Sequence, residues 1–124
     1  DAKGRILGDV AAKAAHILRG KHKASYTPNM DDGDYVVIVN ADKVEVSGKK
    51  LKQKQYHFHS GYVGNIKSVS LEEMLQKKPA HVLELAVKGM IKRSRLGREQ
   101  LRNLRVYAGP EHPHASHNPV PVAL

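Results

Sequence analysis

The chain has 124 residues, 40% of them hydrophobic and 27% charged, and its formal net charge is +9. This length and composition indicate one globular domain and exclude a disordered chain, and the longest apolar run, Val36 to Val39, is too short to span a bilayer. The chain has no cysteine, which excludes disulfides and thiolate zinc sites.

The first half of the chain predicts one helix followed by short strands. Residues 6–19 are rich in alanine and repeat apolar side chains at helical spacing, and Gly20 follows as a helix stop. Residues 35–40 form a continuous β-branched run, which is typical of a strand buried on both faces. Residues 43–47 alternate between apolar and charged side chains, so we expect a strand there, and residues 55–59 predict a short strand or extended segment.

The second half predicts further helices before a last strand. Residues 61–67 contain two glycines and predict a loop, after which Ser70 and Glu73 form a capping box at the start of a helix. The remaining expected elements are a helix at residues 81–90 after Pro79, a basic helix at residues 96–103 and a strand at residues 105–108.

Strands that alternate with helices predict an α/β fold, here a compact three-layer domain in which helices cover a mostly parallel central sheet. We expect this domain to comprise residues 1–109. Four prolines lie between residues 110 and 124 and predict an extended C-terminal tail whose path depends on a partner.

Positive charge is concentrated in three separate clusters. Residues 88–105 carry seven Lys or Arg and one acid, a net charge of +6 out of the chain's +9, and further clusters lie at residues 19–23 and 49–54. Such density indicates a polyanionic partner, and three separate clusters favour a grip on a folded polyanion at several points. The alternative is a solvated helix face, although such a face normally mixes Glu with Lys.

Two histidine pairs, His57 with His59 and His112 with His114, have the spacing of metal ligands. A catalytic zinc needs three protein ligands and an open position, and neither pair belongs to an acid-paired metal motif. Residues 31–34 resemble part of a calcium loop but lack its later bidentate Glu, so a turn is the better interpretation. Walker, dinucleotide-binding and serine-nucleophile motifs are absent. No active site is evident, and we expect neither a metal nor a cofactor.

Three long blocks carry a family resemblance: RGKHK at residues 19–23, NADKV at residues 40–44 and VYAGPEHPH at residues 106–114. Their sequence and order resemble the ribosomal protein L-thirteen family, in its bacterial or organellar branch, and the resemblance runs from Asp1 to about Pro121. It implies a compact α/β domain that binds large-subunit rRNA, acts early in subunit assembly and catalyses nothing. The family opens with a strand that this sequence lacks, so we expect upstream residues to add a strand beside residues 35–40.

We therefore expect a structural, rRNA-binding constituent of the large subunit, located on the ribosome in the bacterial cytoplasm or, alternatively, in a mitochondrion or plastid. Its partners would be large-subunit rRNA and neighbouring ribosomal proteins, with no membrane and no small-molecule substrate. Two alternatives stay open: a free regulatory RNA-binding protein acting off the ribosome, and a metal-dependent enzyme that uses His57 and His59. The expected RNA-binding residues are Arg19, Lys21, His22, Lys23, Lys49, Lys50, Lys52, Lys54, His59, Lys67, Lys88, Lys92, Arg93, Arg95, Arg98, Arg102, Arg105, His112 and His114.

Overall fold

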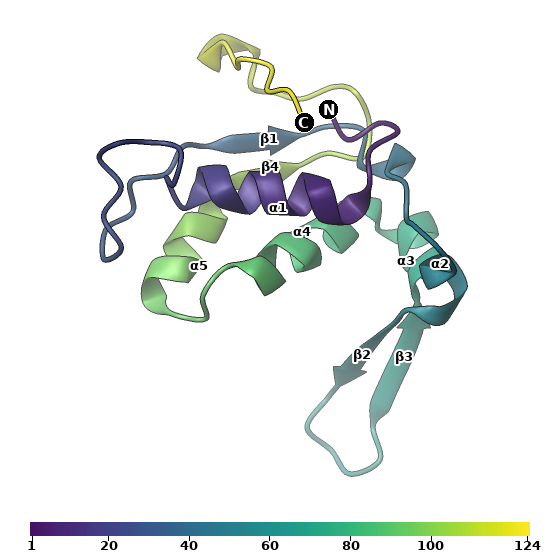
Figure 1. Ribbon diagram of the computed structural model, residues 1–124. Helices are drawn as coiled ribbons and strands as arrows, with labels where there is room; N and C mark the ends of the chain where they lie inside the picture. The colour runs from purple at the N-terminus through teal and green to yellow at the C-terminus, as the bar shows by residue number, and fades with distance from the viewer.

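Two amphipathic helices packed against each other form the centre of the molecule. In the computed structural model, which describes residues 1–124, α1 (Leu7–Leu18) lies beside α4 (Pro79–Met90) (Figure 1). Both helices were expected, because their apolar residues recur at helical spacing and so form one buried stripe each. The buried side chains of the two stripes are Leu7, Val10, Ala11, Ala14, Ala15 and Leu18 in α1, and Val82, Leu83 and Val87 in α4.

A parallel pair of short strands packs against these helices. Strand β1 (Val36–Ile38) pairs with β4 (Leu104–Val106), and Val36 lies opposite Leu104 in the register. The fold is therefore α/β with parallel strands, as predicted, but the parallel sheet has two strands only. A two-stranded sheet gains stability here because α1 covers β1 and α4 covers β4.

The strand expected at residues 43–47 does not form. Asn40 adopts a left-handed backbone conformation with φ of +56°, and a 3-10 turn follows at Ala41–Lys43. The Asn40 and Ala41 N–H groups donate to the Gly109 and Tyr107 carbonyls, which ties this turn to the chain after β4. Only one isolated bridge, between Ile6 and Glu45, remains of the predicted strand. Alternating side chains marked a half-buried segment correctly, but its backbone hydrogen bonds run to Gly4, Arg5 and Leu7, where the chain enters α1, and form no regular ladder.

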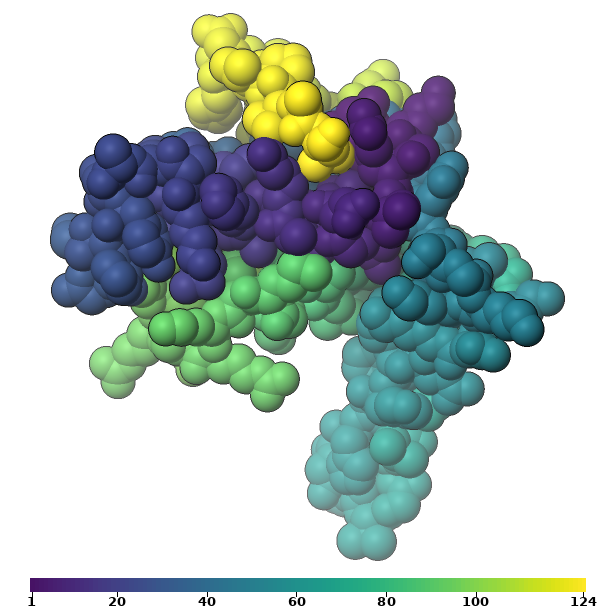
Figure 2. Space-filling model, viewed as in Figure 1, coloured from purple at the N-terminus to yellow at the C-terminus, as the bar shows by residue number.

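A hairpin projects from the body of the molecule (Figures 1 and 2). Its strands β2 (Gln55–His59) and β3 (Ile66–Ser70) are antiparallel. The first strand was expected, whereas the loop predicted at residues 61–67 is shorter, because its last two residues belong to β3. The short helices α2 (Lys50–Gln53) and α3 (Leu71–Lys77) flank the hairpin.

The Ser70 half of the expected capping box forms at the start of α3, whereas the Glu73 carboxylate pairs with Lys77. The Ser70 hydroxyl oxygen accepts a hydrogen bond of 3.3 Å from the Glu73 N–H, which satisfies one of the free donors of the first turn. The Leu71 and Met74 side chains are buried, so the cap also fixes the direction in which the chain returns from the hairpin to the core.

The basic helix α5 (Arg95–Arg102) begins one residue earlier than expected. Ile91 leaves helix α4 in an extended conformation and is itself buried, which turns the chain before α5 starts. Ser94 then caps α5, because its hydroxyl oxygen accepts a 3.2 Å hydrogen bond from the Gly97 N–H. The predicted last strand is observed as β4, again one residue earlier.

After β4 the chain has little regular structure beyond a 3-10 turn at Ala115–His117. The Tyr107 hydroxyl lies 2.7 Å from Nε2 of His114, which holds the start of the tail to the domain. No residue from 110 to 124 is buried. No helix in the structure combines the length and the hydropathy that a membrane crossing requires.

The edge of β1 that faces away from β4 borders a groove of about 530 Å3. Helix α1, the β1 edge and the last residues of the tail line this groove. The Ala2 N–H donates a 3.0 Å hydrogen bond to the carbonyl of Val39, just beyond β1. The groove leaves room for the upstream strand expected beside residues 35–40, and that strand stays a prediction.

Candidate nucleic-acid interface

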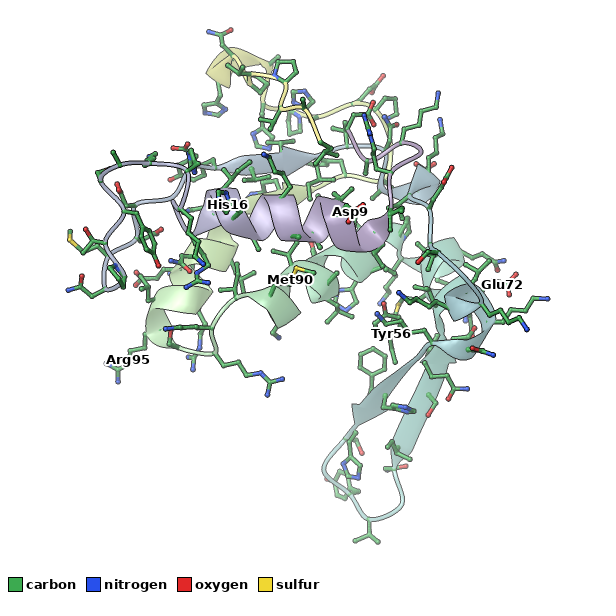
Figure 3. The ribbon with its side chains drawn as sticks, viewed as in Figure 1. Asp9, His16, Tyr56, Glu72, Met90 and Arg95 are labelled. Atoms are coloured by element: carbon green, nitrogen blue, oxygen red, sulfur yellow. The ribbon has the colours of Figure 1, made fainter.

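Helix α5 presents three arginines to solvent. Arg95, Arg98 and Arg102 are spaced as one helical face, are all exposed, and have no acidic partner. Figure 3 shows the Arg95 side chain pointing away from the body of the molecule. On the other side of the segment Leu101 packs against the core and Leu104 is buried, as predicted. We call the three arginines the α5 face.

The cations beside the α5 face are less uniform. Lys88, at the end of α4, and Lys92 and Arg93, in the turn before α5, are exposed and free of acidic partners. The Arg105 guanidinium instead donates to the Arg102 carbonyl at 2.6 Å and to the Leu104 carbonyl at 2.9 Å. These two bonds hold Arg105 against the end of α5, which limits its reach toward a ligand.

The second cluster lies in the loop of residues 19–34. Asp34 lies 2.8 Å from Nε2 of His22 and 2.9 Å from Nζ of Lys23. The hydrogen bond from Lys23, followed by that from His22, lowers the pKa of Asp34, and the same contact raises the pKa of Lys23. His22 and Lys23 therefore stabilise the loop, while Arg19 and Lys21 have no acidic partner.

A contiguous lysine cluster surrounds α2, at the opposite end of the molecule from α5 (Figure 1). We call Lys49, Lys50, Lys52 and Lys54 the α2 cluster, and all four are exposed without an acidic partner. Lys54 Nζ lies 5.5 Å from the centre of the Tyr56 ring, within cation–π range. Tyr56 lies where the hairpin leaves the body (Figure 3), and its burial raises the pKa of the hydroxyl.

The hairpin extends the α2 cluster with a surface that contains no acidic residue from 55 to 70. It carries the expected RNA-binding residues His59 and Lys67, both exposed. It also exposes Phe58 and Tyr62, the second to 74%. Sequence reasoning missed these two aromatic side chains, although an aromatic residue in an acid-free turn between short polar strands is a usable signal for base stacking.

The histidines do not form a metal centre. His57 Nδ1 lies 2.7 Å from the Ser68 hydroxyl, and Nδ1 of His59 accepts a 2.9 Å hydrogen bond from the Gly61 N–H. In the tail, the His114 ring lies 6.1 Å from that of His112 and 5.7 Å from that of His117, centre to centre. No three histidine or acidic side chains come together in a way that could hold a metal ion.

The structure brings two of the three clusters together. Arg19, from the loop, and Lys92, from the turn before α5, line the same small hollow, although they are far apart in the sequence. Figure 2 shows the loop and the α5 region as one continuous surface, with the α2 and hairpin region at the other end. The cations therefore form two separate surfaces: the loop with α5, and the α2 cluster with the hairpin.

Comparison with known proteins shows one family. The family model described as "Ribosomal protein L13" matches residues 1–113. A large ribosomal subunit protein uL13 from Treponema denticola is 56% identical over 124 residues, which is all of this chain and 87% of the relative. Proteins of the same name from Symbiobacterium thermophilum and Thermotoga maritima are 55% and 53% identical over the whole chain, which covers 87% and 83% of them. This chain therefore belongs to the ribosomal protein L13 family and is a structural constituent of the large ribosomal subunit, not an enzyme.

Proposed function

We propose that this chain binds large-subunit rRNA through its two cationic surfaces and supports an early step of subunit assembly. The observation that carries this proposal is that almost none of the Lys and Arg side chains has an acidic partner within the protein. Of the 21 Lys and Arg residues, only Lys23 and Lys77 form an ion pair with an acidic side chain. A protein that leaves so many cations unpaired on its surface is suited to neutralising a polyanion, which RNA is.

The chemistry of the two surfaces indicates how RNA would be recognised. The α5 face offers guanidinium groups, whose planar donors can hold two phosphate oxygens at once. The α2 cluster offers lysines, which act as point charges beside an aromatic hairpin. Phosphate contacts of both kinds carry no base identity, so RNA shape and backbone would supply the selectivity.

The test is binding of the chain to large-subunit rRNA over a range of salt concentrations. If about six phosphates are neutralised, the logarithm of the affinity should fall against the logarithm of the salt concentration with a slope of roughly −4 to −5. A slope near zero would contradict the electrostatic account.

The assembly step needs a second measurement. Gradient fractionation of growing cells after a labelling pulse should place newly made chain in precursor particles of the large subunit before it appears in mature subunits. Mass spectrometry of the same fractions would identify the neighbouring ribosomal proteins that enter with it. A chain found on RNA outside these particles would favour the free regulatory RNA-binding protein instead.

A further inference from the structure

A small hollow lies where the loop of residues 19–34 meets the turn before α5. Its volume is about 20 Å3, on the order of one water molecule. The side chains that matter for its chemistry are those of Arg19, Tyr26, Lys92, Ser94 and Gln100. Arg19 directly follows α1, Tyr26 lies in the loop, Lys92 and Ser94 lie in the turn, and Gln100 lies in the second half of α5.

Two glycines, Gly97 in the lining of the hollow and Gly33 outside it, fix the backbone segments that carry its two cations. A Cβ atom at Gly33 would lie 1.8 Å from the Leu18 carbonyl oxygen, so the loop lies directly on the end of α1, next to Arg19. A Cβ atom at Gly97 would lie 1.9 Å from the Lys92 carbonyl oxygen, so α5 lies directly on the turn that carries Lys92. Both approaches exclude any side chain at these positions, and they hold the backbone beside Arg19 and at Lys92 in place before a ligand arrives.

Gln100 is the unusual residue of the hollow. Its exposed fraction is only 5%, and its side chain makes no hydrogen bond within the protein. No fully enclosed side-chain nitrogen or oxygen in the molecule lacks a partner, so the Gln100 amide atoms keep some exposure, and the residue lines the hollow. The amide therefore offers hydrogen-bonding groups that no other protein group uses and that a molecule entering the hollow can bind.

The polar groups of the hollow favour a negatively charged ligand. Its lining includes two cations and no acidic residue. The acidic residues of the neighbouring loop already have partners: Asp31 accepts from Asn103, Asp32 from Ser25, and Asp34 from Lys23 and His22. The Ser94 oxygen accepts from the Gly97 N–H, which leaves its own O–H free to donate.

We propose that this hollow binds one phosphate group of rRNA, with Arg19 and Lys92 neutralising its charge and the Gln100 amide donating to one of its oxygens. This inference rests on the proposed function. The volume of the hollow accommodates about one phosphate oxygen and not a whole free anion, which suits a phosphate held in place by the RNA chain. The Ser94 and Tyr26 hydroxyls complete the set of donors around it.

The decisive variant is Gln100→Met, which keeps the length of the side chain and removes only its amide. We expect the affinity for large-subunit rRNA to fall about tenfold, since hydrogen bonds to charged groups are among the stronger ones. The slope of affinity against salt should stay unchanged because no charge is lost, and the melting temperature should not fall. An unchanged affinity would overturn the proposal.

Arg19→Gln and Lys92→Gln test whether both cations hold the same phosphate. Each should make the salt slope shallower by up to about 1, and the double variant should lose less affinity than the product of the two single losses. Lys50→Gln, in the α2 cluster, is the matched control. In the double variant with Arg19→Gln, the loss of affinity should equal the product of the two single losses. If the losses of affinity for Arg19→Gln and Lys92→Gln also multiply in the double variant, the two cations do not hold the same phosphate and the proposal is overturned.

A titration with inorganic phosphate shows whether the hollow binds a phosphate of the RNA chain or a free phosphate ion. Titrated into the free protein, it should shift the side-chain amide resonance of Gln100 only at millimolar concentration, and rRNA should compete with it. Micromolar binding of inorganic phosphate without competition by rRNA would show a site for a free anion and overturn the assignment to RNA. Failure of the unchanged protein to bind rRNA at all would instead contradict the proposed function.

Discussion

Removing the charge of the α5 face should weaken rRNA binding without weakening the fold. The variant carries Arg95→Gln, Arg98→Gln and Arg102→Gln together. All three side chains are exposed and have no acidic partner, so the folded protein loses no ion pair. The hydrogen bond that Arg102 accepts from Arg105 uses its backbone carbonyl, which the substitution keeps. The melting temperature of the free protein should therefore stay within a few degrees.

The size of the binding loss follows from the number of phosphates that the variant no longer neutralises. Each neutralised phosphate contributes about 0.7 to 0.9 to the salt slope, so losing three should make the slope shallower by about 2 to 3. If counterion release supplies the whole loss, the affinity at 0.2 M salt falls roughly 50-fold. Filter binding of the variant and the unchanged protein to the same rRNA, at four or more salt concentrations, measures both quantities.

A charge-matched control separates contact from overall charge. Lys3→Gln, Lys13→Gln and Lys43→Gln remove the same net charge from exposed lysines outside the three clusters. This control should change the slope by much less than 1, because screened charges away from the RNA release few counterions. Equal losses in both variants would refute the reasoning, and so would an unchanged slope in the α5 variant.

Four further outcomes can be checked on the isolated protein. The pKa of Asp34 is lowered from its ordinary value of 3.8, so its ion pairs stabilise the loop at a pH above 3.8 and are lost as the pH falls through the lower pKa of the folded protein. Hydrogen exchange of the loop amides should therefore speed up at low pH relative to its intrinsic rate, and Asp34→Asn should remove this dependence on pH. Dialysis against a chelator should leave the melting temperature unchanged, and a stoichiometric metal whose removal lowers it would contradict this. A chain that ends at Gly109 should keep its circular dichroism spectrum, because no residue beyond it is buried. A chain extended upstream of Asp1 should protect the Val37 amide, which faces away from β4, from exchange; an unprotected amide would exclude the added strand.

The helices could be predicted because their signals are local. The apolar stripe of α1 was expected at residues 6–19 and occurs at Leu7–Leu18. A strand depends on a partner that the sequence does not identify: β1 pairs with β4, more than sixty residues later, and residues 43–47 find no ladder at all. The pattern of side chains was interpreted correctly in that segment, but its backbone hydrogen bonds run to Gly4, Arg5 and Leu7, which the sequence does not identify as partners.

The candidate interface divides in the same way. Runs of Lys and Arg are visible in the sequence, and most of those predicted as RNA-binding are exposed without an acidic partner. The sequence could not show which cations already have an acidic partner, because the pairing of Asp34 with His22 and Lys23 depends on how the loop folds. Nor could the sequence show that Arg19 and Lys92 share a hollow with Gln100, since that requires the fold to bring the loop after α1 beside α5 and the turn before it.

The positions of the two cationic surfaces support a role in organising RNA. The loop and α5 lie at one end of the paired helices α1 and α4, and the α2 cluster with the hairpin lies at the other (Figure 1). Val82, Leu83 and Val87 are fully buried between these ends, and a close-packed core of this kind resists deformation. The distance between the surfaces is therefore set by the protein and not by the RNA. A protein that neutralised phosphates from one surface alone would bind RNA without arranging it, whereas two surfaces at a fixed separation hold two RNA segments in one relative position. Such an arrangement reduces the conformational entropy that the RNA must still lose when later partners bind, and so favours an early place in assembly.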